Sequence, residues 1–145
     1  MVIHQISVFL ENRAGQLAEI TTILAEHNVD MRAIHIAETQ DYGVLRIIAD
    51  DPRRAAAVLS EEGYVVHPTP VVAAAVPDQP GGLNRVLCVL AKENIDIEYM
   101  YSVFGQSNGM AYMIFRVAEP EHLKEILRKN GILVPEGPEM GIKQA

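Results

Sequence analysis

The chain has 145 residues, of which 49% are hydrophobic and 21% charged, and its formal net charge is −7 at pH 7. Nucleic-acid phosphates require clustered lysine and arginine, so this acidic chain argues against a nucleic-acid partner. The only cysteine, Cys88, excludes an intrachain disulfide, and no apolar stretch reaches the roughly 18 residues of a membrane span. We therefore expect a cytoplasmic protein that makes no membrane contact.

The first half of the chain has the predicted element order β-α-β-β-α-β. Alternating apolar residues predict strands at residues 2–10, 29–38, 44–50 and 64–67. Apolar residues at helical spacing predict one helix that begins near Leu17 and stops at Asn28, and another that ends at Gly63. Asp50 or Asp51 can cap this second helix, with proline at its first position.

The same order begins again after Pro68 and Pro70. Strands are predicted at residues 71–76, 95–104, 110–117 and 132–134. Two helices are predicted between them, one from Leu83 that stops near Asn94 and one that follows Glu119. Cys88 lies inside the apolar pattern of the first of these helices, so we expect it in the core. Residues 135–145 show no period and are predicted to form an extended tail.

The two halves are copies of one unit. Identical residues recur 66 positions apart before the second hairpin, as in Gly15 and Gly81, and 68 positions apart after it, as in Gly63 and Gly131. We predict two α+β domains with a ferredoxin-like βαββαβ fold, at residues 1–68 and 69–134, each with an antiparallel sheet and helices on one face. Domains this small have little core, so we expect the copies to pack on each other or on a second chain.

Each copy has a strand-to-helix turn with glycine where the helix begins, at residues 11–17 and 77–83. Backbone N–H groups at a helix start have no partner inside the helix, and the helix dipole adds positive charge there. Such a turn can hold a carboxylate or a phosphate. Alternatively, the glycines only permit a tight turn, and Asn12 and Asp78 only cap the helices. No nucleophile, phosphate-loop or zinc-protease motif is present, so we predict that the protein is not an enzyme.

These residues resemble the ACT domain, a small ligand-binding regulatory module. Asp-Gln-Pro-Gly-Gly-Leu at residues 78–83 matches the family's Asp-x-Pro-Gly-x-Leu, and residues 12–17 match it with asparagine for aspartate and alanine for proline. The family's Asn-Ile-Asp/Asn-Ile feature is present as Asn-Val-Asp-Met at residues 28–31 and Asn-Ile-Asp-Ile at residues 94–97. The resemblance covers nearly the whole chain except the tail, and it is closest to stand-alone tandem ACT proteins that carry no catalytic domain.

The resemblance implies domains that pair side by side through edge strands, usually as a homodimer, and that bind amino acids where two domains meet. Carried over to this chain, it implies ligand contacts at Asn12, Arg13, Ala14, Gly15, Gln16, Leu17, Asp78, Gln79, Pro80, Gly81, Gly82 and Leu83. Backbone N–H groups of both glycine turns would hold the ligand carboxylate, and Asn12 and Asp78 would accept from its ammonium. Arg13 offers a second carboxylate partner. Tyr99 and Tyr101 would face the ligand's side chain, or else are buried sheet aromatics.

We thus predict a non-catalytic, allosteric regulatory module whose ligand is an amino acid. The apolar side chains around Tyr99 and Tyr101 favour a branched-chain or aromatic ligand. The alternative is a regulatory or structural subunit that docks on a separate metabolic enzyme. Nucleic-acid binding shares this element order but requires a basic sheet, and a small enzyme of related topology is a further alternative. The five histidines lack metal-ligand spacing, and we expect no metal and no cofactor.

Overall fold

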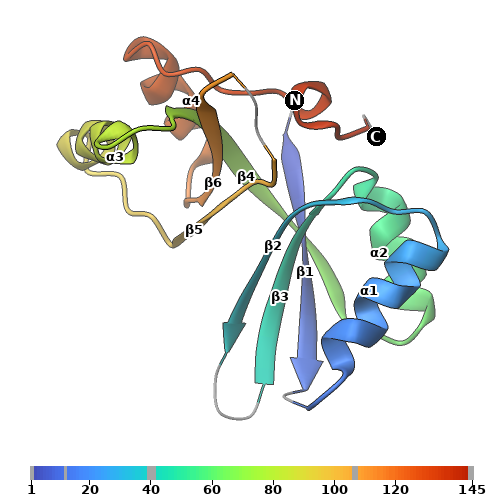
Figure 1. Ribbon diagram of the computed structural model, residues 1–145. Helices are drawn as coiled ribbons and strands as arrows, with labels where there is room; N and C mark the ends of the chain where they lie inside the picture. The colour runs from blue at the N-terminus through green and yellow to red at the C-terminus, as the bar shows by residue number, and fades with distance from the viewer. Residues whose placement is uncertain (1, 12, 39–41, 106–107, 144–145) are drawn as a thin grey trace. The chain divides into compact units, whose positions relative to one another are not determined.

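The computed structural model of the protein describes residues 2–11, 13–38, 42–105 and 108–143. Its elements follow the predicted alternation of strands and helices (Figure 1). They are β1 (Ile3–Glu11), α1 (Gln16–Glu26), β2 (Met31–Glu38), β3 (Tyr42–Ala49), α2 (Pro52–Glu61), β4 (Val66–Pro77), α3 (Gly82–Lys92), β5 (Tyr99–Ser102), β6 (Met110–Arg116), α4 (Pro120–Lys129) and the 3-10 helix η1 (Gly137–Met140).

The chain divides into two compact units. The first unit holds residues 4–69 together with the residues from Met140 onward, and the second unit holds residues 70–139 together with those up to Ile3. Strand order is β2-β3-β1-β4 in the first unit and β4-β6-β5 in the second. The predicted α+β class and ferredoxin-like βαββαβ architecture are confirmed. The predicted domain ranges 1–68, 69–134 and 135–145 stay a prediction.

The core of the first unit lies between its sheet and two helices, α1 and α2, which cover one face (Figure 1). β1 and β3 pair in antiparallel register, which sets Ile6 opposite Ile47 and Val8 opposite Leu45. Burying these large apolar side chains against the helices contributes about 1.5–3 kcal/mol each. The helix residues in this core are Ile20, Ile23, Leu24, Ala55, Val58 and Leu59.

The second unit repeats this core with different side chains. β4 pairs with β6, and β6 contributes the fully buried Phe115. Backbone geometry repeats as well, because Asn28 and Asn94 both end their helices in the left-handed region, at φ 56° and 54°. Val29 N–H then donates to Leu24 O at 2.9 Å. Ile95 N–H donates to Leu90 O at 3.0 Å in the same way, so the sequence repeat is a repeat of backbone hydrogen bonds.

One predicted break is wrong. The structure has a single strand, β4, where we predicted separate strands on either side of Pro68 and Pro70. Proline lacks an N–H, but residues two apart in a strand direct their N–H groups to the same side. The two prolines therefore remove donors from one side of β4 only, and the strand continues through them.

The second unit departs from its predicted elements in three places. Strand β5 covers Tyr99–Ser102 only, whereas we predicted a strand at residues 95–104. Residues 132–134 form no strand, although Ala75 N–H still donates to Leu133 O at 2.9 Å, as Phe9 N–H donates to Val65 O at 3.1 Å in the first unit. Cys88 is exposed, contrary to the prediction of a core residue. Its helix turns Val86 and Leu90 toward the core, which puts Cys88 on the opposite side.

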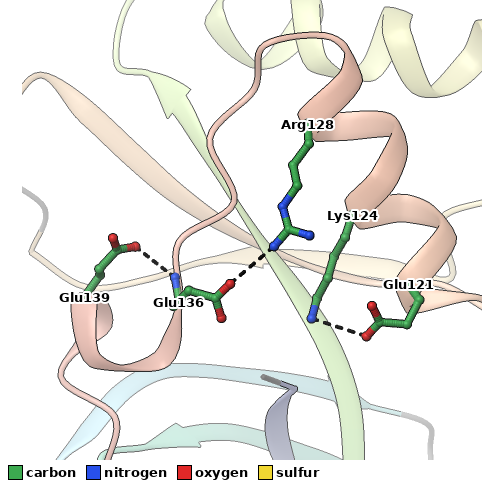
Figure 2. A network of polar contacts seen from close by, with 5 residues as sticks. All are labelled: Glu121, Lys124, Arg128, Glu136 and Glu139. Atoms are coloured by element: carbon green, nitrogen blue, oxygen red, sulfur yellow. Dashed lines mark hydrogen bonds and ion pairs between the residues drawn. The ribbon is translucent and has the colours of Figure 1, made fainter.

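The tail, predicted to be extended, contains η1. Glu136 ties this segment to α4, because its carboxylate lies 3.3 Å from the Arg128 guanidinium and its N–H donates to Glu139 (Figure 2). Met140, the last residue of η1, and Ile142 are only 1% and 8% exposed. Burial of these two apolar side chains stabilises the packed tail, whereas an extended tail would leave them exposed to water.

Two hydrogen bonds, one from a side chain and one between backbone groups, fix residues 140–143 on the first unit. Arg32 Nε donates to Met140 O at 3.1 Å, and Lys143 N–H donates to Asp50 O at 2.6 Å. These residues therefore complete a unit from which they are distant in the sequence.

Met140→Ala should lower the free energy of unfolding by about 3 kcal/mol, because it leaves a cavity at a fully buried site. Lys143→Ala is the matched control, since the bond from Lys143 uses its backbone, and its effect should stay within about 0.5 kcal/mol. Urea denaturation of both variants measures the difference. Equal effects would show that Met140 does not stabilise the fold.

Gly82 sits where the second turn closes most tightly. A Cβ at this position would lie 1.9 Å from Pro77 O, and Gly82 N–H donates to Gln79 O at 3.0 Å. The first turn carries Gln16 at the equivalent position, and its N–H lies 3.5 Å from Arg13 O. The first turn is thus open enough for a side chain, and the second is not.

Gly82→Ala should therefore cost about 3 kcal/mol or more, because backbone atoms must move to admit the methyl group. Gly81→Ala meets open space and strains only a positive φ of 85°, at about 1–2 kcal/mol. Thermal and urea denaturation would compare the two. A smaller loss for Gly82→Ala than for Gly81→Ala would contradict the tight closure.

Candidate functional site

In the described part of the chain α1, α3 and α4 begin without a capping side chain, and two of them, α1 and α3, begin at the glycine turns. Gly15 and Gly81 are the N-cap residues of α1 and α3, and neither helix has a side-chain cap within the described part of the chain. α2 differs, since the Asp51 carboxylate accepts from Arg54 N–H at 3.1 Å, which confirms the predicted cap. The glycine turns therefore present open helix N-termini, where N–H groups and the helix dipole favour an anion.

The first turn carries a network of charged side chains. The Arg13 guanidinium lies 3.8 Å from Glu11 and 3.6 Å from Glu19. The Tyr64 hydroxyl donates to the same Glu19 carboxylate at 2.5 Å. The Arg13, Glu11 and Glu19 side chains are 52%, 84% and 50% exposed, so their ion pairs contribute little stability and can be exchanged for others.

Tyr64 is a neutral hydrogen-bond donor. Desolvation, the hydrogen bond to Glu19 and the negative charge of Glu19 raise the pKa of Tyr64 to about 12, against opposing effects of Arg13 and Gln16. At neutral pH its proton therefore stays on the phenol and points to Glu19.

Gln16 is the buried polar residue of the turn. It is 7% exposed, and its amide oxygen Oε1 has no hydrogen-bond partner among the described residues. A buried acceptor without a partner costs about 1–3 kcal/mol and is rare in native proteins. Gln16 thus offers an acceptor to an incoming N–H donor.

Two hollows adjoin the first turn, and both are lined by Arg13 and Gln16. The smaller is about 90 Å³ and is completed by Leu10, Glu11, Leu17, Ile36 and Gly43. The larger, which we call the first-turn cleft, is about 400 Å³, within the range of small-molecule sites. Its other residues are Phe9, Leu10, Glu11, Glu19, Glu62, Gly63, Tyr64 and Val65.

The equivalent cavity of the second unit is smaller and mostly apolar. It measures about 130 Å³ and is lined by Ala75, Pro77, Arg85, Val86, Met110, Gly131, Ile132 and Leu133. The residues in the places of Arg13, Glu19 and Tyr64 are Gln79, Arg85 and Ile132. The polar network of the first turn therefore has no counterpart among these residues of the second unit.

The structure brings together only part of the predicted site. Arg13, Gln16 and Leu17 line the hollows of the first turn, and Ala14 and Gly15 lie exposed beside them. Asn12 lies outside the described residues. In the second turn, the exposed residues are Asp78, Gln79, Pro80 and Gly81, whereas Gly82 is buried and Leu83 half-buried.

Asp78 and the β5 tyrosines remain apart from these hollows. Asp78 does not cap α3, and its N–H donates to Gly109 O at 2.8 Å. Tyr99 and Tyr101 stack on each other with ring centroids 6.4 Å apart, and neither lines the cavities described above. Their contact with a ligand stays a prediction.

Sequence reasoning missed Glu19, Glu62 and Tyr64 as site residues. The signal lay in the repeat, because Tyr64 stands where the second copy has the apolar Ile132. When one copy of a repeat carries a polar side chain where the other is apolar, that position is a candidate for a function found in one copy only.

The described residues hold no group of three or more histidine, cysteine, aspartate or glutamate side chains that could bind a metal ion. In the same residues, no helix has both the length and the apolar character needed to cross a membrane.

Comparison with solved structures shows that BT0572 from Bacteroides thetaiotaomicron is similar to this chain over nearly its full length. The two are 36% identical with a TM-score of 0.89, over 97% of this chain and 96% of that one. The ligand-free regulatory subunit of aspartate kinase from Thermus thermophilus shares the fold at 16% identity, with a TM-score of 0.64 over 88% and 93% of the chains. Its counterpart from Thermus flavus is 15% identical, with a TM-score of 0.57 over 89% and 93%.

The comparison with curated proteins gives no match. Among family models, the one described as an ACT domain pair matches residues 1–137, which are almost the whole chain. The protein therefore belongs to the ACT family, as a pair of ACT domains.

Proposed function

We propose that this protein is a non-catalytic regulatory module that binds an amino acid at its first glycine turn. The observation that carries the proposal is the buried, unpartnered Oε1 of Gln16, which lines the same cleft as Arg13. An acceptor and a cationic donor in one cleft match the ammonium and carboxylate of an amino acid.

The ligand carboxylate would bind Arg13 and the N–H groups at the start of α1. The ligand ammonium would donate to Gln16 Oε1 and to Glu19. Such a ligand replaces the weak exposed pair between Arg13 and Glu19 by two ion pairs, one at each end of the zwitterion. It also supplies the hydrogen bond that the buried Gln16 oxygen lacks.

A regulatory role follows from the kind of protein that shares this architecture. The two Thermus proteins that share the fold are regulatory subunits of aspartate kinase. In this chain, the ligand would act allosterically, by stabilising one arrangement of paired ACT domains over another. In keeping with the family, we place the complete site where two ACT domains meet.

The second turn is a weaker candidate for the same ligand. Its helix start is equally open, but its cavity has a single charged side chain, Arg85, and is about a third the volume of the first-turn cleft. The predicted preference for branched-chain or aromatic side chains belongs to this copy, where Tyr99 and Tyr101 lie.

Titration calorimetry of the full chain against the twenty amino acids should show heat of binding for at least one of them at millimolar concentration. Arg13→Ala should weaken that binding at least tenfold, since it removes the charged partner of the carboxylate. Gln79→Ala, the same change at the equivalent exposed position of the second turn, is the control and should leave affinity within about twofold.

Loss of binding in Gln79→Ala with retention in Arg13→Ala would move the site to the second turn. If no amino acid gives heat, the amino-acid proposal fails.

The alternative function is that of a subunit that docks on a separate metabolic enzyme. It is favoured by β5, which ends the strand order of its unit and so offers an edge for pairing. The same feature supports a homodimer joined through edge strands. Sedimentation of the purified chain at micromolar concentration should give twice the 16.0 kDa mass of one chain. A monomer over that range would contradict the homodimer.

A further inference from the structure

The first-turn cleft carries more negative than positive charge. Three carboxylates line it, from Glu11, Glu19 and Glu62, against the single guanidinium of Arg13. Its remaining polar groups are Gln16 and Tyr64, which are neutral. A zwitterion that uses Arg13 and Glu19 therefore leaves two carboxylates, on Glu11 and Glu62, without a cation from the ligand.

Helix dipoles reinforce this asymmetry. The cleft lies against the N-terminus of α1, where partial positive charge favours a carboxylate. It also lies against the C-terminus of α2, where Glu62 is the C-cap and the dipole is negative. One end of the cleft therefore favours an anion, and the end at Glu62 favours a cation.

The second unit provides an internal comparison. Asn130 stands in the place of Glu62, and its side chain donates to Ile126 O at 2.8 Å. Pro77 and Arg85 stand in the places of Glu11 and Glu19. The equivalent cavity therefore carries no carboxylate at these positions.

We propose that the first-turn cleft selects an amino acid with a cationic side chain. The α-carboxylate binds Arg13 at the α1 end, the α-ammonium binds Gln16 Oε1 and Glu19, and the side-chain cation reaches toward Glu62. This inference rests on the proposed function and names the class of its ligand. Complementary charge is the basis of the selection, because a cationic side chain offsets part of the excess negative charge of the cleft, which neutral and anionic side chains leave in place.

The experiment compares lysine, norleucine and glutamate by calorimetry with the full chain at low salt. Norleucine retains the lysine backbone and most of its side chain but has no side-chain ammonium. We expect lysine to bind about tenfold more tightly than norleucine, and glutamate to bind most weakly. The ratio of lysine to norleucine affinity should fall as salt rises, because the carboxylates are exposed to solvent.

Glu62→Gln should lower the lysine-to-norleucine ratio about threefold while leaving norleucine affinity unchanged. Glu93→Gln is the matched control, because Glu93 is the C-cap of α3 in the other unit. It should leave the ratio unchanged. Thermal melting of both variants checks that each remains folded.

The outcomes separate this inference from the proposed function. Binding of norleucine or glutamate at least as tight as that of lysine would overturn the charge selection and leave amino-acid binding in place. A lysine-to-norleucine ratio that Glu62→Gln leaves unchanged would show that Glu62 does not cause the preference, and would also overturn the inference. Absence of binding by all three, and by the other amino acids, would remove both proposals.

Discussion

The open N-terminus of α1 is the constraint on which the candidate site depends. A capping serine, threonine or aspartate is worth about 1 kcal/mol to a helix, and the chain uses one at α2. α1 instead begins at a glycine with φ 85° and forgoes that stabilisation. The helix start lies in the same turn as Arg13 and Gln16, which line the cleft. The end of α1 that lacks a cap is therefore also the end at which partial positive charge favours an anion.

The two copies share a backbone and differ in the side chains laid upon it. The helix-ending asparagines and the glycine turns recur with nearly identical dihedral angles. The side chains diverge at positions that do not affect these angles, such as Tyr64 and Ile132. Gln16 and Gly82 are the exception, because the closer approach of Pro77 in the second turn admits no side chain. A turn that must hold a glutamine is thus also a turn with a wider opening.

Most of the fold was predictable because apolar periodicity decides element type. The order of strands and helices and the cap at Asp51 required only local patterns. The burial of Cys88 was predicted wrongly because the positions next to it in the helix are also apolar. The sequence alone therefore did not show which face of the helix turns toward the core. The predicted strand break at Pro68 and Pro70 was wrong, because local propensity does not show which side of a strand has no neighbouring strand to pair with.

Less of the candidate site was predictable. The glycine turns and Arg13 follow from the repeat and the family motif. Glu62 and Tyr64 follow the end of α2, and Tyr64 is 45 residues from Glu19 in the sequence. Only the packing of that helix brings them to the turn. Which polar group lacks a partner, here Gln16 Oε1, depends on every neighbour at once and cannot be derived from one sequence.

The placement of residues 140–143 has a consequence for synthesis of the protein. These residues belong to the first unit, yet they follow residues 70–139, which build the second. Translation therefore delivers the last part of the first unit only after the whole of the second has been made. During that interval the surface that Met140 and Ile142 cover is bare, so the copy made first is finished last.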